Sequence, residues 1–447
     1  MSSSNYDSQA SEVIVDHLKE VFLDLSKAPY PHVENPPHCT KRASVALVVR
    51  IQPGHATWPP TSQSSCEVRD LETFETFFSS PWVQHGDPEV LFIKRAARAG
   101  DRWTSHVALP GGKRDPEDED DKAAAVRETW EEVGLDLTGS NAIFVGNLPA
   151  RVVTTSWGKV PLMVLCPFVF LLTRHDVPPL KLQPSEVGSS HWVPIRALLS
   201  PSLRSFERCD VSDRLARQGG SITRALLRAM LGQMLFAAVR LTPSQSVYCT
   251  TSPGFLPEEP TVANDTLFRS WRRRVQQWWL GDHAASPSHD RPLLLWGLTL
   301  GIMADFLELL PPYNALELWT YPTFTPADVR LAIWAMTHTF RKRKRKEVEE
   351  GKQRASVAVE HDQGPDSNPP IAESKHQESK VGIDGYGVGG RRGRARQDRF
   401  GARSSAVGVM LDGYYDLVRK AVAVALLTRL AVPTVLMILW VRMKRRH

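Results

Sequence analysis

The sequence predicts an α/β fold that is followed by a polar linker and a hydrophobic tail helix. Two patterns indicate the α/β part: short apolar runs typical of buried strands, and segments with apolar residues at helical spacing. The chain has 447 residues, more than one ordinary domain, and 42% of them are hydrophobic, which is enough for a packed core. The net charge of +6 is modest and does not indicate nucleic-acid binding.

Helices and strands follow one another along the first 340 residues. Apolar runs predict strands over 43–51, 89–95, 142–145 and 162–172. Helical spacing predicts helices over 5–27, 195–205, 222–241, 292–310 and 327–340. We therefore expect an N-terminal helical extension over 1–40 and a folded domain over 41–340, with a long insertion around 205–290 that is irregular beyond 242.

A short helix that starts at the acidic pair Asp120-Asp121 and stops at Gly134 is unusual in its charges. Near its C-terminal end it carries three carboxylates, Glu128, Glu131 and Glu132. The helix dipole disfavours each of them there by roughly 0.3–1 kcal/mol. At about 100° per residue, the three glutamates fall on the side opposite to the apolar residues Ala123, Val126, Trp130 and Val133.

A bound divalent cation would make this charge pattern favourable. Three carboxylates suit a hard cation such as Mg²⁺ or Mn²⁺, which usually completes its coordination shell with water and substrate phosphates. A metal site of this kind therefore predicts a diphosphate substrate. Arg127 lies between the two faces and can hold a carboxylate in place. The structural alternative is a solvated acidic helix face.

The residues around this helix resemble the Nudix box, which reads Gly, five residues, Glu, seven residues, Arg-Glu, an aliphatic residue, any residue, Glu-Glu, any residue, Gly and an aliphatic residue. Several positions match it: Arg127, Glu128, Glu131, Glu132, Gly134 and Leu135, with Glu119 eight residues before Arg127. Two positions depart from it. The gap from Gly112 to Glu119 is one residue too long, and Thr129 replaces the aliphatic residue.

The resemblance implies an α/β/α sandwich with a mixed sheet and an enzyme that hydrolyses nucleoside diphosphates linked to another moiety. It implies metal binding by Glu128, Glu131 and Glu132, with help from Glu119, and orientation of these acids by Arg127. Glu128 and Glu131 are then also catalytic. We further expect Gly111 and Gly112 to allow the backbone to approach the phosphates closely.

The chain is also similar to the coenzyme A diphosphatase branch of this family. The segment 90–94 gives a strand before Arg95, and 105–112 gives the Pro-Gly-Gly ending, although Ser105 replaces Gly and Leu109 replaces Phe. The segments 186–194 and 296–299 also look like this branch. The similarity implies cleavage of coenzyme A, an acyl-coenzyme A or a related nucleotide, with Arg95 at the substrate.

Three points stay open in the sequence. Glu186 lies in a loop, where it is either a general base or extra metal ligand, or a surface acid. The domain could sense a nucleotide without cleaving it, or remove RNA caps through the basic linker, although nucleic acid is an unlikely partner. The aromatic and basic cluster over 271–279 could stack a base, but packing at an edge of the fold is the more common role.

The C-terminal part differs in composition. Residues 341–404 start with a basic run and contain few apolar residues, so we expect a disordered linker. A helix is expected over 405–447, with a hydrophobic stretch over 421–441 that is long enough to span a bilayer, interrupted by Arg429. We expect this stretch to anchor the protein to an organelle membrane, of a mitochondrion or peroxisome. The alternative is a helix at the membrane interface or docked on the enzyme. The five cysteines without CxxC spacing indicate an intracellular protein.

Overall fold

The computed structural model describes residues 3–59, 71–96, 106–139, 142–154, 160–210, 221–249, 293–311, 320–361, 410–411 and 413–445. Several predictions fall outside these residues. They concern Ser105, the aromatic cluster over 271–279 and the greater part of the linker, from 362 to 404.

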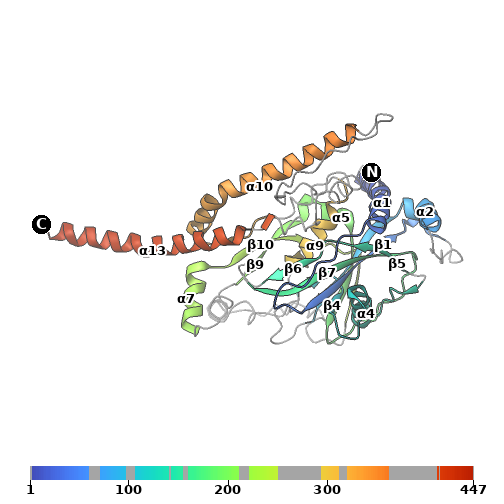
Figure 1. Cartoon of the computed structure of the whole chain (residues 1–447), viewed down its shortest axis with the longest axis horizontal. Coiled ribbons are helices and arrows are strands. Elements are labelled where there is room, and N and C mark those ends of the chain that lie inside the picture. The colour runs from blue at the N-terminus through green and yellow to red at the C-terminus, as the bar shows by residue number, and fades with distance from the viewer. Residues whose placement is uncertain are drawn as a thin grey trace, which may run out of the picture.

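A nine-stranded mixed sheet forms the centre of the protein (Figure 1). The long strands follow the order β11-β8-β2-β1-β7-β5; β1 and β7 are parallel and the other neighbours are antiparallel. Three short strands, β3, β4 and β6, pair with β2, β1 and β7. The bounds are β1 (Arg42–Gln52), β2 (Asp87–Arg95), β3 (Val107–Ala108), β4 (Gly111–Lys113), β5 (Ala142–Asn147), β6 (Arg151–Thr154), β7 (Pro161–Leu172), β8 (Val187–Pro194) and β11 (Gln245–Tyr248).

Helices cover both faces of this sheet. On one face lie α1 (Ser3–Lys27), α2 (Leu71–Ser79), α3 (Pro81–Gln84), α5 (Ile195–Leu199) and α9 (Gly297–Leu307), whose core includes Leu18, Phe22 and Phe306. On the other face lies α4 (Asp121–Val133), which packs Ala125 and Val133 against the sheet. Successive residues of β1 point to opposite faces, which is why one strand serves both cores. The expected α/β/α sandwich with a mixed sheet is confirmed.

A second, four-stranded sheet lies beside the first and contains β9 (Arg204–Cys209), β10 (Met234–Arg240), β12 (Leu294–Trp296) and β13 (Thr323–Phe324). The prediction of one helix over 222–241 is wrong. The helix α7 (Ser221–Leu231) ends at Gly232, whose φ of 62° is left-handed, and β10 follows. A side chain at this position would also meet Thr325 Oγ1 at 2.4 Å. Strands likewise occupy part of the predicted helices over 195–205 and 292–310.

The linker does not begin at residue 341. Helix α10 (Ala327–His361) continues through the basic run, so the prediction of disorder is wrong for residues 341–361. The reason is that Arg, Lys, Glu and Ala are strong helix formers, and a helix needs no apolar residues of its own once packing has started it upstream.

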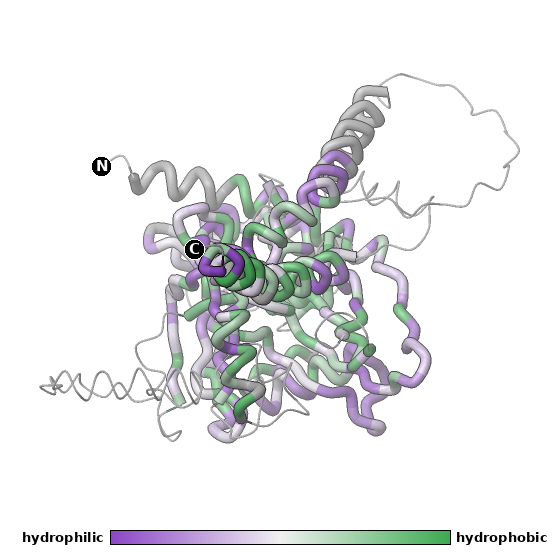
Figure 2. The backbone as a smooth tube through the Cα atoms, turned by 90° about the vertical axis from the view of Figure 1, so that its left-hand side faces the viewer, coloured by the Kyte–Doolittle hydropathy of each residue, from purple (hydrophilic) through white to green (hydrophobic). Residues whose placement is uncertain are grey.

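The tail helix α13 (Tyr414–Lys444) packs its first half on the protein and then extends away from it (Figure 1). Tyr414, Val418 and Ala421 are buried in one core with α10. Arg429 forms an ion pair with Asp328 of α10, with 2.6 Å between Nη2 and Oδ1. Figure 2 shows apolar residues along the rest of this helix.

The prediction that residues 421–441 cross a membrane is not supported by the structure. Within the residues that the structure describes, no helix combines the length and the hydropathy that a membrane crossing requires. The physical reason is that the stretch is divided between two surroundings. Ala421 and Ala425 belong to a protein core, and the charge of Arg429 interrupts the apolar sequence and is held by α10.

One buried polar contact joins the main sheet to α4, and another joins two of its strands, β8 and β11. At the start of α4, Asp121 receives three hydrogen bonds from Arg42 of β1, at 2.7–2.9 Å, and both side chains are 9% exposed. On β8, the His191 ring lies between the hydroxyls of Ser189 and Ser246, each at 2.8 Å. His191 is 1% exposed, and burial lowers its pKa to about 4.

Asp121→Asn should destabilise the protein by about 3 kcal/mol, because it leaves the Arg42 guanidinium buried without its counter-charge. Chemical denaturation followed by circular dichroism measures the loss. The matched control is Asp176→Asn, which removes the partner of Arg174 in an exposed pair (side chains 32% and 42% exposed) and should cost less than about 1 kcal/mol. Equal losses in the two variants would show that the buried pair does not fix α4.

His191 should make the protein less stable as the pH falls from about 6.5 to about 4. The unfolded chain binds the proton with the ordinary pKa of 6.5, and the folded chain only near 4, so acid favours the unfolded state. The contribution is fully present above pH 6.5 and amounts to about 3 kcal/mol. His191→Gln should flatten the pH dependence of the unfolding free energy by this amount. Parallel curves for the two proteins would contradict the neutral, buried ring.

Candidate active site

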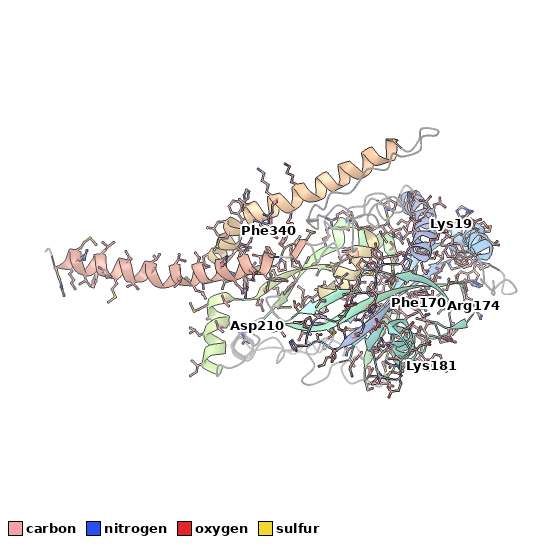
Figure 3. The ribbon with its side chains drawn as sticks, in the orientation of Figure 1. Lys19, Phe170, Arg174, Lys181, Asp210 and Phe340 are labelled. Carbon is pink, nitrogen blue, oxygen red and sulfur yellow. The ribbon has the colours of Figure 1, made fainter. Side chains whose placement is uncertain are left out.

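The helix α4 is held at both ends by contacts that the sequence encodes locally. At its start, Asp120 Oδ1 accepts a hydrogen bond from Ala123 N at 2.6 Å, as an N-cap. At its end, Gly134 adopts the left-handed conformation with φ of 66°. The segment that follows β7 then bonds to the last carbonyls: Lys181 N donates to Val133 O and Gln183 N to Glu132 O, each at 2.9 Å. Lys181 is labelled beside α4 in Figure 3.

The predicted division of this helix into an apolar and an acidic side is only partly right. Trp130, expected on the buried side, is 57% exposed, whereas Glu132, expected on the open side, is 1% exposed. Helix α4 turns its acidic side toward β1 and β4, with Ala125 and Thr129 on the same buried face. Thr129, which replaces an aliphatic residue of the Nudix box, is fully buried and donates its hydroxyl to Ala125 O at 2.7 Å.

The glycine pair of β4 makes room for the glutamates. A Cβ on Gly112 would lie 2.4 Å from Oε2 of Glu128, so any other residue would displace this carboxylate. Gly111 has φ of 144°, and a Cβ there would lie 2.2 Å from the carbonyl oxygen of Ser44. Its N–H donates to Glu132 Oε2 at 2.8 Å. The contacts of both glycines are thus with α4 and β1. The close approach of their backbone to phosphates stays a prediction.

Arg127 connects the glutamates to the loop before α4. Its Nε and Nη2 each donate to the Asp118 carboxylate at 2.9 Å, and Nη1 donates to Glu131 at 3.0 Å and Glu128 at 3.3 Å. The hydrogen bonds from Arg127 hold the pKa of Asp118 below its usual value. The pKa of Arg127 is in turn raised, mainly by Asp118.

Asp118 is the residue that sequence reasoning missed. From the sequence we expected Glu119 to help to bind the metal, but Glu119 is exposed, and its backbone carbonyl accepts a hydrogen bond from Arg114. The signal for Asp118 was present in the spacing, since five residues separate it from Gly112, as the Nudix box requires for its first acid. The extra residue of this chain therefore lies between the first acid and Arg127.

The buried glutamates have strongly perturbed acidity. Burial raises the pKa of Glu132 to about 8; the Gly111 N–H and Arg95 oppose this shift, while Glu128 and Glu186 add to it. Burial also raises the pKa of Glu128, to which Glu131 and Glu186 contribute by repulsion. The cost of the acidic cluster thus comes mainly from loss of hydration and from mutual repulsion.

The structure brings Glu186 and Arg95 to the same place. Glu186 is half-buried in the turn before β8, and its carbonyl accepts a hydrogen bond from Ala96 N at 2.7 Å, which ties it to the end of β2. Its charge acts on both Glu128 and Glu132. Arg95 Nη1 lies 3.8 Å from Glu132 Oε1 and is partly exposed. Glu186 is therefore close enough to raise the pKa of both glutamates, and its role as general base or extra metal ligand stays a prediction.

The donor set suits a hard cation, although the side chains are not arranged around one point. Among the described residues, no three acidic, histidine or cysteine side chains converge as in a finished metal site. Glu131 bonds to Arg127 and Glu132 bonds to the Gly111 amide. Burial, and to a lesser extent mutual repulsion, raises the pKa values of Glu128 and Glu132 and disfavours their charged forms, which a divalent cation would stabilise.

Comparison with known proteins agrees with this geometry. Residues 82–209 match the NUDIX domain family. An uncharacterized protein of Schizosaccharomyces pombe is 32% identical over 293 residues, which are 64% of this chain and 77% of that protein. The mouse mitochondrial coenzyme A diphosphatase NUDT8 is 44% identical over 52 residues, which are 12% of this chain and 25% of that protein.

The chain is also similar, at low overall TM-scores, to solved structures. A MutT/nudix family protein from Enterococcus faecalis has a TM-score of 0.23 and 15% identity, over 50% of this chain and 56% of that one. A NUDIX hydrolase from Alicyclobacillus acidocaldarius has a TM-score of 0.22 and 18% identity, over 42% of this chain and 90% of that one. Residues 82–209 match the family model and include α4 packed on β4, so the chain carries a Nudix domain.

Proposed function

We propose that this protein is a metal-dependent hydrolase that cleaves the diphosphate linkage of coenzyme A, an acyl-coenzyme A or a related nucleoside diphosphate derivative. The observation that carries the proposal is the burial of Glu128 and Glu132 beside each other and Glu186, with pKa values raised by burial and repulsion. Such a cluster is costly in a purely structural role, and it becomes favourable when a cation and a phosphate substrate are present.

The side chains have distinct roles in this proposal. Glu128, Glu131 and Glu132 hold Mg²⁺ or Mn²⁺, which when bound polarises a phosphoryl oxygen and acidifies a water. Arg127 positions Glu131 and Glu128 through hydrogen bonds, while Asp118 fixes Arg127 from the other side. Glu186 accepts a proton from the attacking water or adds a ligand. Arg95, close to Glu132 and partly exposed, attracts the substrate phosphates.

Coenzyme A derivatives are favoured by local similarity. The mouse and human mitochondrial coenzyme A diphosphatases NUDT8 are 44% and 46% identical to this chain over 52 and 50 residues. The replacement of Phe by Leu109 in the expected motif does not weaken the case, because Leu109 is 2% exposed and belongs to the core. Its side chain affects packing behind the site.

Glu131→Gln should abolish turnover and leave the fold intact, because Glu131 is half exposed and its role is charge. Purified protein with Mg²⁺ or Mn²⁺ is incubated with coenzyme A, acetyl-coenzyme A and a panel of dinucleotides, and monophosphate products are measured by chromatography. We expect a loss of at least about 100-fold in kcat, equivalent to about 2.7 kcal/mol. The control Glu20→Gln changes an exposed acid of α1 and should keep the wild-type rate.

Wild-type turnover by Glu131→Gln would refute its assigned role. A wild-type protein that binds these compounds and releases no product would indicate a sensor in place of an enzyme. Products from dinucleotides alone, with coenzyme A untouched, would retain the hydrolase and refute the coenzyme A assignment.

Glu132→Gln should stabilise the metal-free protein while removing activity. A neutral amide avoids the cost of a buried carboxylate, and its oxygen can still accept the hydrogen bond from the Gly111 N–H. We expect an increase in unfolding free energy on the order of 1–3 kcal/mol at pH 7 in the presence of a chelator. Thermal unfolding is then repeated with Mg²⁺, which should raise the Tm of the wild type more than that of the variant. A variant that is stabilised by Mg²⁺ as much as the wild type would show that Glu132 is not a ligand.

A further inference from the structure

Aromatic rings of the second sheet lie next to the proposed active site. The half-buried indole of Trp296, on β12, contacts the Phe236 ring of β10, with 5.6 Å between centroids and 42° between planes. On its other side it contacts the His106 imidazole at 4.8 Å and 63°. His106 immediately precedes β3, so these three rings, which we call the aromatic shelf, join the two sheets.

The strand register shows which face of the second sheet carries the shelf. Trp296 pairs with Ala238 of β10, and Phe236 lies two residues before Ala238, so both rings project from one face. The alternate residues of β10, Ala237 and Val239, point to the opposite face and are buried in the main core. The aromatic face of β10 also carries Met234, which is buried in the core that α10 and α13 share, and Phe236 packs against this core. Trp296 lies on the edge strand β12 of this sheet and remains half-buried.

The shelf is connected to the proposed phosphate site through β2 and β3. Arg95 N donates to His106 O at 2.9 Å, which extends the ladder in which Ile93 pairs with Ala108 and Lys94 with Val107. This hydrogen bond places His106 opposite Arg95, next to the irregularity that β2 has between Lys94 and Arg95 in its pairing with β8. Arg95 in turn approaches Glu132. From the acidic cluster to the aromatic shelf, the residues therefore follow one another as Glu132, Arg95, His106 and Trp296.

Space is open beside the indole. Gly297, the next residue, has φ of 65°, and a Cβ placed on it would meet no atom of the described residues within 4 Å. The three rings come from three separate elements, yet Trp296 and Phe236 remain only half-buried. The uncovered part of each ring is aromatic surface that is accessible to a ligand.

We propose that the aromatic shelf binds the nucleobase of the substrate, by stacking on Trp296, while the diphosphate lies at Arg95 and the glutamates. This inference rests on the proposed function and adds the surface that selects nucleotide substrates. A purine or pyrimidine presents a flat π-face, and stacking on an indole is worth about 1–3 kcal/mol per base. Trp296 and Phe236 lie outside residues 82–209, so the segment that follows the Nudix domain supplies the selectivity.

The test compares two probes that the enzyme cannot cleave: α,β-methylene-ADP, which has a base, and methylenediphosphonate, which has none. Their Kd values are measured by calorimetry with the full chain and Mg²⁺. Trp296→Ala and Trp296→Leu should weaken α,β-methylene-ADP by about 5- to 100-fold and leave methylenediphosphonate unchanged. Trp296→Phe, which keeps a ring, should stay within about threefold of the wild type. The control is Trp334→Ala, an exposed tryptophan of α10 that should change neither value.

The outcomes separate the two proposals. If the wild type binds both probes and Trp296→Leu binds α,β-methylene-ADP as tightly, the shelf does not contact the base. Equal weakening of both probes in Trp296→Leu would likewise overturn the shelf, because the effect would then act on the phosphate site. If the wild type binds neither probe, the proposed function itself fails.

Discussion

The packing of the acidic face of α4 against a pair of glycines is the constraint on which the rest of the site depends. Without a side chain at Gly112, the Glu128 carboxylate can lie against the backbone of β4; without one at Gly111, β4 can lie against β1. The carboxylates of Glu128 and Glu132 are then shielded from water, which is why their pKa values rise. The fold pays for this arrangement with hydrophobic burial elsewhere, in the two cores that cover the sheet.

Elements with a clear hydrophobic pattern were predictable from the sequence. The end of an element was not predictable where a single residue determines it. The strands β1, β2 and β7 are continuous apolar runs, and the structure places them within a residue or two of the predicted bounds. The segment from Ser221 to Arg240 keeps helical spacing throughout, yet Gly232 divides it into a helix and a strand. A single glycine was too weak a signal to indicate this change against the hydrophobic pattern.

In the site, residue types could be predicted from the sequence, whereas the orientation of the side chains could not. The sequence identified the glutamates, Arg127 and the glycine pair, because residue type and spacing are sufficient to recognise an acidic helix. It could not show that Glu132 is buried and Trp130 exposed, since a helical projection gives the angle between residues and not the direction in which the sheet lies. Asp118, which binds Arg127, was missed for a related reason. Asp118 has the spacing from Gly112 that the Nudix box requires, whereas its neighbour Glu119 has the required spacing to Arg127.

The parallel pairing of β1 with β7 has a consequence for how the protein is made. These two strands lie next to each other in the middle of the sheet, but α4, β2 and β5 all lie between them along the chain. During synthesis β1 cannot gain this neighbour until the ribosome has completed β7, and long-range closure of this kind slows folding. The acidic face of α4 therefore cannot pack against a complete sheet until the later half of the domain has been synthesised.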